Sequence, residues 1–129
     1  MKLAECDLES TTTYSQGRFY QTEKLPKELP GDYELRTWRE RCHVAESGHL
    51  FIPPMQFANC LKEAALFLSL QIPGKNRQTF TKHYQAGVMV SEPLILKPTK
   101  DTIEYEDVLV PSNGQKGGGS RVVKRFPIV

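Results

Sequence analysis

The chain contains little cysteine and no long apolar run. Its three cysteines, Cys6, Cys42 and Cys60, have no CxxC spacing, so we expect neither a disulfide framework nor a zinc site. No apolar segment approaches the roughly 20 residues that cross a bilayer, and no basic stretch followed by an apolar one opens the chain. These absences predict a cytoplasmic protein with no signal peptide and no membrane partner.

Motifs of catalysis are also missing. The chain has no HExxH and no GxSxG sequence, and its glycine run lacks the lysine and hydroxyl of a Walker loop. The histidines His43, His49 and His83 are scattered rather than paired at helical spacing. We therefore predict no catalytic residue, no metal and no cofactor. RNA cleavage with His83 or His43 as a general base is the weakest of three functional hypotheses.

What is present is an ordinary globular composition with unevenly placed charge. The 129 residues are 25% charged and 39% hydrophobic, which predicts a single domain over residues 1–129 with a modest core. Residues 1–74 contain eight Lys or Arg and ten Asp or Glu, whereas residues 75–129 contain nine and five. This asymmetry favours an acidic partner for the C-terminal part, although short basic stretches are often only solvated.

The most informative segment is the glycine-rich stretch Pro111–Arg125. Its glycines expose backbone N–H groups and let another backbone approach closely. The short strand expected after them carries Arg121, Lys124 and Arg125 and no acid. This combination suits a phosphate backbone better than a core. The alternative interpretation is the mobile tip of a hairpin.

The pattern along the chain predicts an α+β fold. Weak alternation predicts a strand at residues 2–9, and two prolines place residues 24–32 in a loop. A helix capped by Asp32 is preferred over a strand for residues 32–41. Further signals predict a turn at Glu46-Ser47-Gly48, a β-rich stretch at 83–96, and strands at 103–110 and 121–129.

The clearest expected element is a helix that follows Pro53-Pro54 and is stopped by Pro73-Gly74. We interpret its apolar face, together with the thiol of Cys60, as core rather than as a ligand-binding surface. The apolar residues that recur at helical spacing are Phe57, Leu61, Ala64, Ala65 and Leu68.

Basic residues interleaved with aromatic ones form the candidate binding site. Cations hold phosphates, and aromatic rings stack on unpaired bases. An alternative interpretation is that Trp38 is buried and that the neighbouring arginines pair with Glu34 and Glu40. The predicted phosphate contacts are Arg36, Arg39, Arg41, Lys75, Arg77, Lys82, Lys116, Arg121, Lys124 and Arg125. The predicted stacking residues are Tyr14, Trp38, Phe80 and Tyr84.

Residues 51–65, which read FIPPMQFANCLKEAA, resemble the start of the first helix in RAMP proteins. These proteins are the RNA-binding backbone and processing subunits of CRISPR effector complexes, and their pattern there is I-P-G-S-S-h-K-G-A-h-R. In this chain Pro54 stands where the family has glycine, and Asn59 to Lys62 replaces its Lys-Gly pair. These departures weaken the case for an RNA contact at the helix start.

Nearly the whole chain resembles uncharacterised phage and prophage proteins that have a RAMP-like core. The resemblance implies a ferredoxin-like (RRM-like) antiparallel sheet packed on one main helix. Members of that group continue into a second half, whereas the second helix and final strand of a βαββαβ unit cannot be placed before Val129. The chain is then a short form, a fragment, or a module whose open sheet edge a second chain completes. The matching segments are 13–18, 36–41, 72–75, 79–87 and 116–122.

Two functional hypotheses follow from the residues and the resemblance. The first is a nucleic-acid-binding module, with single-stranded RNA as the favoured ligand. The second is a protein-interaction factor of phage origin that docks on a CRISPR-type or other host defence complex by mimicking a backbone subunit. The open sheet edge and the helix face at residues 55–70 would carry that protein contact.

Overall fold

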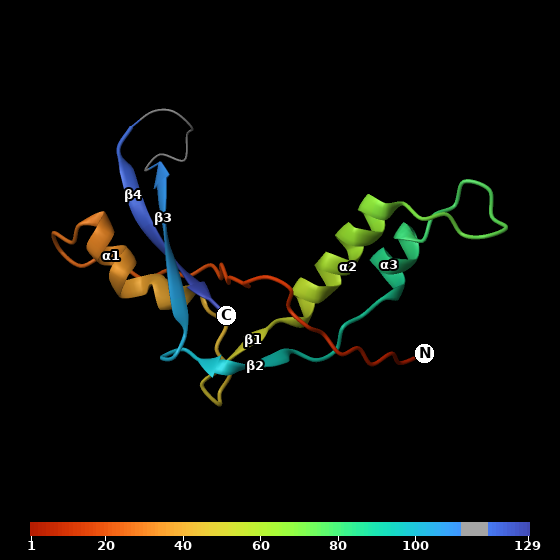
Figure 1. Cartoon of the computed structure of the whole chain (residues 1–129), viewed down its shortest axis with the longest axis horizontal. Helices are drawn as coiled ribbons and strands as arrows, with labels where there is room; N and C mark the ends of the chain where they lie inside the picture. Colours follow the sequence, from red (N-terminus) through yellow and green to blue (C-terminus); the bar gives the residue numbers. More distant parts are fainter. Residues whose placement is uncertain (112–118) are drawn as a thin grey trace. The chain divides into compact units, whose positions relative to one another are not determined.

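The computed structural model describes residues 1–111 and 119–129 of the chain. These residues form a mixed α+β structure of three α-helices, one short 3₁₀ helix and two two-stranded sheets (Figure 1). The α+β class predicted from the sequence is therefore confirmed. The chain divides into two compact units, residues 1–43 with 98–129 (unit 1) and residues 44–97 (unit 2), and each unit is described by itself.

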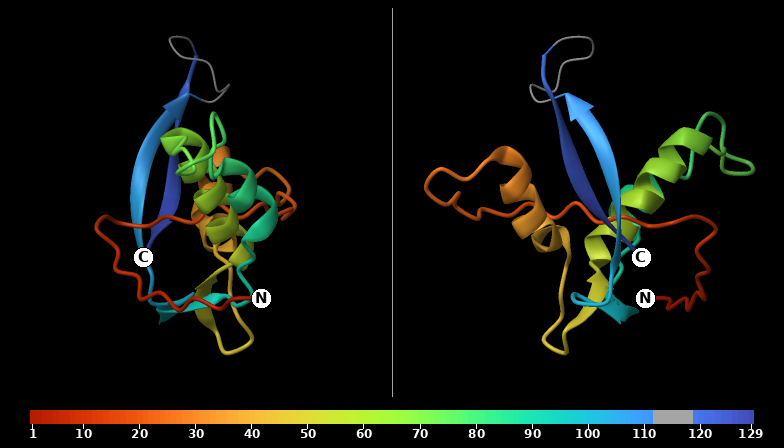
Figure 2. Two further views of the ribbon diagram at one scale, coloured as in Figure 1. Left: turned by 90° about the vertical axis from the view of Figure 1, so that its right-hand side faces the viewer. Right: turned by 60° about the vertical axis from the view of Figure 1, so that its left-hand side comes forward.

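Unit 1 is built around the hairpin of β3 (Glu104–Pro111) and β4 (Arg121–Ile128). The two strands pair antiparallel, from Glu104 opposite Ile128 to Pro111 opposite Arg121. Helix α1 (Pro30–Thr37) lies beside β4, on the side away from β3 (Figure 2). Both strands were predicted within one residue, because alternating side chains are a local signal that survives in a half-exposed hairpin.

Helix α1 begins at Pro30 and continues as the 3₁₀ helix η1 (Trp38–Arg41). The predicted helix therefore exists, but it starts two residues earlier than expected. Proline suits the first turn of a helix because its missing N–H would have no partner there. Asp32 does not cap the helix but lies inside its first turn. There its negative charge interacts favourably with the positive end of the helix dipole.

The N-terminal segment joins unit 1 only from Tyr14 onward. Tyr14 and Val129 exchange backbone hydrogen bonds of 3.2 and 2.8 Å, and the Arg18 N–H donates to the Arg41 carbonyl at 2.9 Å. The strand predicted at residues 2–9 is wrong, since these residues are irregular and exposed. The alternation of apolar and polar residues at 2–9 does not by itself produce a strand. No described strand lies beside this segment to form backbone hydrogen bonds with it.

The core of unit 1 is small and partly polar. Trp38, Cys42 and Ile103 are its buried hydrophobic residues, and Thr37 and Gln16 are each 1% exposed. The Gln16 side-chain oxygen accepts the backbone N–H of His43 at 2.7 Å. The buried side-chain amide of Gln16 therefore links the N-terminal segment by a hydrogen bond to the residues that follow η1.

Unit 2 contains β1 (His49–Ile52), α2 (Pro54–Leu68), α3 (Thr81–Gly87) and most of β2 (Leu94–Thr99), whose last two residues are assigned to unit 1. Strand β1 pairs with β2, and Gly48 before β1 has a left-handed φ of 82°, as the predicted turn requires. The prediction of a β-rich stretch at 83–96 is wrong for its first part, which is helix α3. Lys, His, Gln and Ala there are compatible with a helix, and Val88 and Val90 of the alternation follow its end.

Helix α2 is present as predicted, but it is not a buried core. None of its residues is buried, Leu61 is 39% exposed and Leu68 is 58% exposed. Cys60, expected to be buried, is exposed. The helix ends at Leu68, with the left-handed Ser69 (φ 45°) as its cap, and Thr81 of α3 donates its hydroxyl to the Ala65 carbonyl at 3.0 Å.

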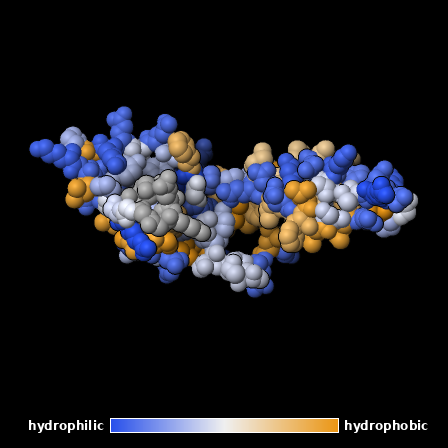
Figure 3. Space-filling model, turned by 90° about the horizontal axis from the view of Figure 1, so that it is seen from above, coloured by the Kyte–Doolittle hydropathy of each residue, from blue (hydrophilic) through white to orange (hydrophobic). Residues whose placement is uncertain are grey.

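Exposed apolar side chains therefore lie among polar ones on α2, α3 and the segments next to them, as the orange patches in Figure 3 show. Leu66, Phe67, Leu70 and Met89 are each more than half exposed. Leu50 of β1, which is fully buried, is the buried hydrophobic residue of unit 2. Helix α2 has 15 residues, and within the described part of the chain no helix combines the length and the apolar character that a membrane span needs.

Candidate nucleic-acid interface

A cleft of about 340 Å³ opens in unit 1 between α1, β4 and the segment around residues 20–24. Three cations and two tyrosine rings share this cleft with a single acidic residue, Glu34, among its described lining. A surface that presents cations next to aromatic rings is typical of single-stranded nucleic-acid binding. The lining residues are Tyr20, Lys24, Pro30, Tyr33, Glu34, Arg41, Val122, Val123 and Lys124.

The charge of Glu34 is offset inside the protein. Glu34 is 8% exposed, and its Oε1 accepts both the Arg41 Nη2 at 2.5 Å and the backbone N–H of Arg125 at 3.2 Å. The guanidinium of Arg41 also lies over the Phe126 ring, 5.1 Å from its centroid. Because the negative charge of Glu34 is paired with the positive charge of Arg41, Glu34 adds little repulsion toward an anion in the cleft.

Arg41 has one donor with no hydrogen-bond partner in the part of the chain that the structure describes. Its Nε atom is buried and has no hydrogen-bond partner among residues 1–111 and 119–129. A buried donor without a partner costs about 1–3 kcal/mol. An acceptor supplied by a bound molecule is one way to remove that cost, and Arg41 lines the cleft.

The two tyrosines of the cleft are fixed by hydrogen bonds. The Tyr33 hydroxyl donates to the Thr22 carbonyl at 2.8 Å, and the Tyr20 hydroxyl lies 3.2 Å from the Thr37 Oγ1. The Lys24 Nζ lies 5.5 Å from the centroid of the Tyr33 ring. Ring and ammonium group therefore form one preorganised surface.

Three of the predicted phosphate contacts are engaged in ion pairs within unit 1. Arg36 makes a bidentate pair with Glu28, with N–O distances of 2.8 and 2.9 Å. Arg125 makes a bidentate pair with Asp107 at 2.8 Å for both contacts. Arg41 pairs with Glu34, as described above. Arg121 and Lys124 have no carboxylate partner among the described residues, and both are exposed.

The Arg36–Glu28 pair predicts an unusual titration. The hydrogen bond from Arg36 lowers the pKa of the Glu28 carboxyl from its ordinary 4.5 to about 2. A depressed folded-state pKa contributes stability that is present above about pH 4.5 and is lost as the pH falls through about 2.

We expect the side-chain carboxyl carbon of Glu28 to titrate in NMR with a midpoint near 2. Arg36→Met should return the midpoint to the ordinary range, whereas Arg39→Met should leave it in place. An ordinary midpoint in the unaltered chain would mean that Arg36 is free for other anions.

Trp38 does not offer a ring to a base. It is 2% exposed, its ring meets Tyr105 edge-on at 5.4 Å and 63°, and the Arg39 guanidinium lies 4.4 Å from its centroid. The alternative interpretation, in which Trp38 is buried and Arg41 pairs with Glu34, describes this structure. Glu40 pairs with Lys100 at 3.2 Å instead of with an arginine. Tyr14 is half-buried.

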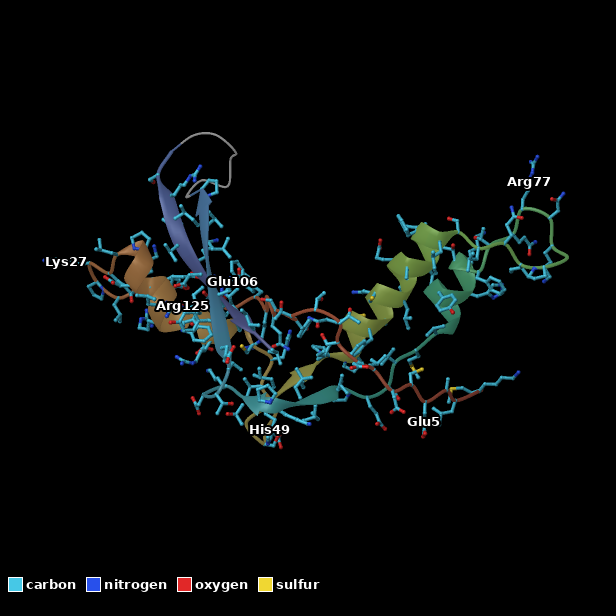
Figure 4. The ribbon with its side chains drawn as sticks, viewed as in Figure 1. Glu5, Lys27, His49, Arg77, Glu106 and Arg125 are labelled. Atoms are coloured by element: carbon cyan, nitrogen blue, oxygen red, sulfur yellow. The ribbon has the colours of Figure 1, made fainter. Side chains whose placement is uncertain are left out.

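The remaining predicted residues belong to unit 2. Arg77 lies near the end of the loop between α2 and α3 and points away from both helices (Figure 4). Lys75, Arg77 and Lys82 form no ion pair with the described residues, and Phe80 and Tyr84 are 38% and 37% exposed. The structure does not assign these side chains to the cleft of unit 1. Lys116 lies outside the described residues.

Lys24, Tyr20 and Tyr33 were not predicted, although all three line the cleft. No spacing rule connects them, because they meet only where the N-terminal segment pairs with Val129 and Arg41. The one sequence signal was compositional, namely a lysine between two tyrosines in a short polar stretch. Such a pattern is too common to identify a site.

Nothing in the described residues adds a metal or catalytic centre. No group of three His, Cys, Asp or Glu residues there could hold a metal ion. Burial, followed by the charge of Arg18, lowers the pKa of His43, while His83 lies in unit 2 against the Phe80 ring. The chain matches no family model, no curated protein and no solved structure.

Proposed function

We propose that this chain binds single-stranded nucleic acid, with RNA favoured, at the cleft of unit 1. The observation that carries the proposal is the lining of the cleft, where Lys24, Arg41 and Lys124 accompany two fixed tyrosine rings. Cations supply affinity for the phosphate backbone, and ring faces accept unstacked bases without sequence preference. The Glu34–Arg41 ion pair is neutral as a whole, so the net positive charge of the described lining comes from Lys24 and Lys124.

The charge of the hairpin supports a particular path for the strand. β4 carries Arg121 and Lys124, whereas the neighbouring β3 carries Glu104 and Glu106. Figure 4 places Glu106 on β3 and Arg125 on β4. We infer that the nucleic acid follows β4 and α1 and avoids β3, because the exposed acids of β3 repel phosphates.

The RAMP-like, ferredoxin-type arrangement remains part of this proposal. Its support is limited to the element order, in which the strand β1 is followed by the helices α2 and α3 and then by β2 and the β3–β4 hairpin. The described strands pair as two separate two-stranded sheets, β1 with β2 and β3 with β4, rather than as one ferredoxin-like sheet. RAMP proteins bind RNA, so the resemblance agrees with the proposed ligand. An experimental structure of the full chain with RNA tests both statements at once.

The proposed function is tested by fluorescence anisotropy with a labelled single-stranded RNA. We expect saturable binding at low salt, weaker binding to a duplex of the same sequence, and a loss of affinity as salt rises. Absence of binding to single-stranded RNA and DNA at low salt would contradict the proposal. A high 260/280 nm absorbance ratio of the purified protein that collapses in high salt would support it.

The exposed apolar surface of α2 favours a second function, a protein-interaction factor. An apolar helix face of this kind is normally covered by another element or by a partner. A CRISPR-type or other host defence complex is the partner that the phage-protein resemblance suggests. Co-purification of the chain with a protein complex that lacks nucleic acid would favour this function over the first.

A further inference from the structure

We propose that the outer edge of β4, at Val123, holds one phosphate group of the bound nucleic acid. This inference rests on the proposed function and names the atoms that meet the ligand backbone. The outer edge is the edge of β4 that faces away from β3. The proposed phosphate site consists of the Val123 backbone N–H together with Lys24 and Lys124, which line the same cleft.

The direction of the Val123 N–H follows from its neighbours. In an antiparallel pair, residues alternate between those bonded to the partner strand and those whose N–H and C=O point away. The Arg125 N–H donates to Glu34 on α1 instead of to β3, and Val129 bonds to Tyr14. Val123, two residues before Arg125, therefore also points its N–H outward.

This outward N–H of Val123 has no acceptor among the described residues. Pro127, at the corresponding position nearer the C-terminus, has no N–H to satisfy, which suits a strand edge. Arg125 and Val129 have acceptors. By the same alternation the outward positions of β4 are Arg121, Val123, Arg125 and Pro127. Of these, Val123 is the one that lines the cleft, whereas Arg121 does not line it.

The contact with Glu34 shows that the outer edge of β4 binds an anionic group. Its carboxylate is an anion that receives an outward N–H of β4 and the guanidinium of Arg41. A phosphate at Val123 repeats the same interaction one outward position along the strand, with Lys24 and Lys124 as its cations. The buried Nε of Arg41 adds a donor without a partner to the same cleft. Backbone N–H groups and cations together are a recurrent way to hold phosphate.

Proline substitution tests the Val123 N–H directly. Val123→Pro removes this one donor without breaking the ladder, because the N–H faces away from β3. The matched control is Leu109→Pro, since Leu109 is the register partner of Val123 and its N–H points out of the opposite edge. We expect Val123→Pro to weaken single-stranded RNA binding about tenfold and Leu109→Pro to leave it unchanged. Equal affinities of the two variants would overturn the inference.

A second measurement covers the case in which a proline variant fails to fold. Backbone amide NMR spectra of the unaltered full chain are recorded with single-stranded RNA and, separately, with inorganic phosphate. We expect the Val123 amide signal to move in both titrations, while the Arg125 amide, held by Glu34, stays in place.

The two titrations distinguish the failure of each proposal. RNA binding without movement of the Val123 amide would overturn the phosphate site and leave the proposed function standing. Movement with phosphate in a chain that does not bind RNA would overturn the proposed function and leave an anion site at Val123. No response in either titration would overturn both.

Discussion

Glu34→Ala is expected to destabilise unit 1 by about 3–5 kcal/mol, because removal of one partner leaves the other charge of a buried ion pair uncompensated. Glu34 and Arg41 have side chains that are 10% and 15% exposed. The substitution also takes the acceptor from the Arg125 N–H at the edge of β4. Chemical denaturation followed by circular dichroism measures the loss of unfolding free energy.

The matched control for Glu34→Ala is Glu40→Ala, a few residues away. Glu40 pairs with Lys100, but both side chains are well exposed, at 41% and 37%. Such surface pairs contribute roughly 0–1 kcal/mol, so Glu40→Ala should be almost neutral. The double variant Glu34→Met with Arg41→Met should recover part of the loss, since it leaves no buried charge. Equal effects of Glu34→Ala and Glu40→Ala would contradict the buried role of Glu34.

Replacement of the three cations Lys24, Arg121 and Lys124 by glutamine is expected to weaken single-stranded RNA binding about 100-fold at low salt. The loss of three contacts of roughly 1 kcal/mol each corresponds to a change in affinity of this size. Lys24 and Lys124 line the cleft, and Arg121 opens β4 beside it. None of the three has a carboxylate partner among the described residues, so their removal should spare the fold.

The matched control removes an equal charge from unit 2 by changing Lys75, Arg77 and Lys82 to glutamine. The sequence predicts these residues as phosphate contacts as well, whereas the cleft belongs to unit 1. We expect the control to weaken binding only slightly, through the general loss of positive charge. An equal or larger effect of the unit 2 variant would place the principal contact outside the cleft.

The elements that the sequence predicts correctly are those with local signals. Alternation in β3 and β4, and the helical spacing of apolar residues in α2, come from a few neighbouring residues. Burial depends on which other elements pack against a helix, and nearby residues do not show this. The sequence therefore predicts α2 as part of the core, although none of its residues is buried. The strand predicted at 2–9 failed for a related reason, since a strand exists only where another strand pairs with it.

The site was predictable only in part, because its geometry joins distant residues. Arg121 and Lys124 are exposed cations, as the sequence indicates. The sequence could not show that Arg125 forms an ion pair with Asp107 and Arg36 with Glu28. The contact between Glu34 and the Arg125 N–H joins residues 91 positions apart in the sequence. No rule based on local residue spacing predicts such a contact.

The salt dependence of RNA binding tests the central claim most directly. The logarithm of the binding constant is measured against the logarithm of salt concentration for the unaltered chain and for the variant that lacks Lys24, Arg121 and Lys124. Each phosphate contact to a single strand contributes about 0.7 to the slope, so we predict that the variant's line is flatter by about 2. Parallel lines for the two proteins would mean that these cations do not contact phosphates, and the proposed site would be wrong.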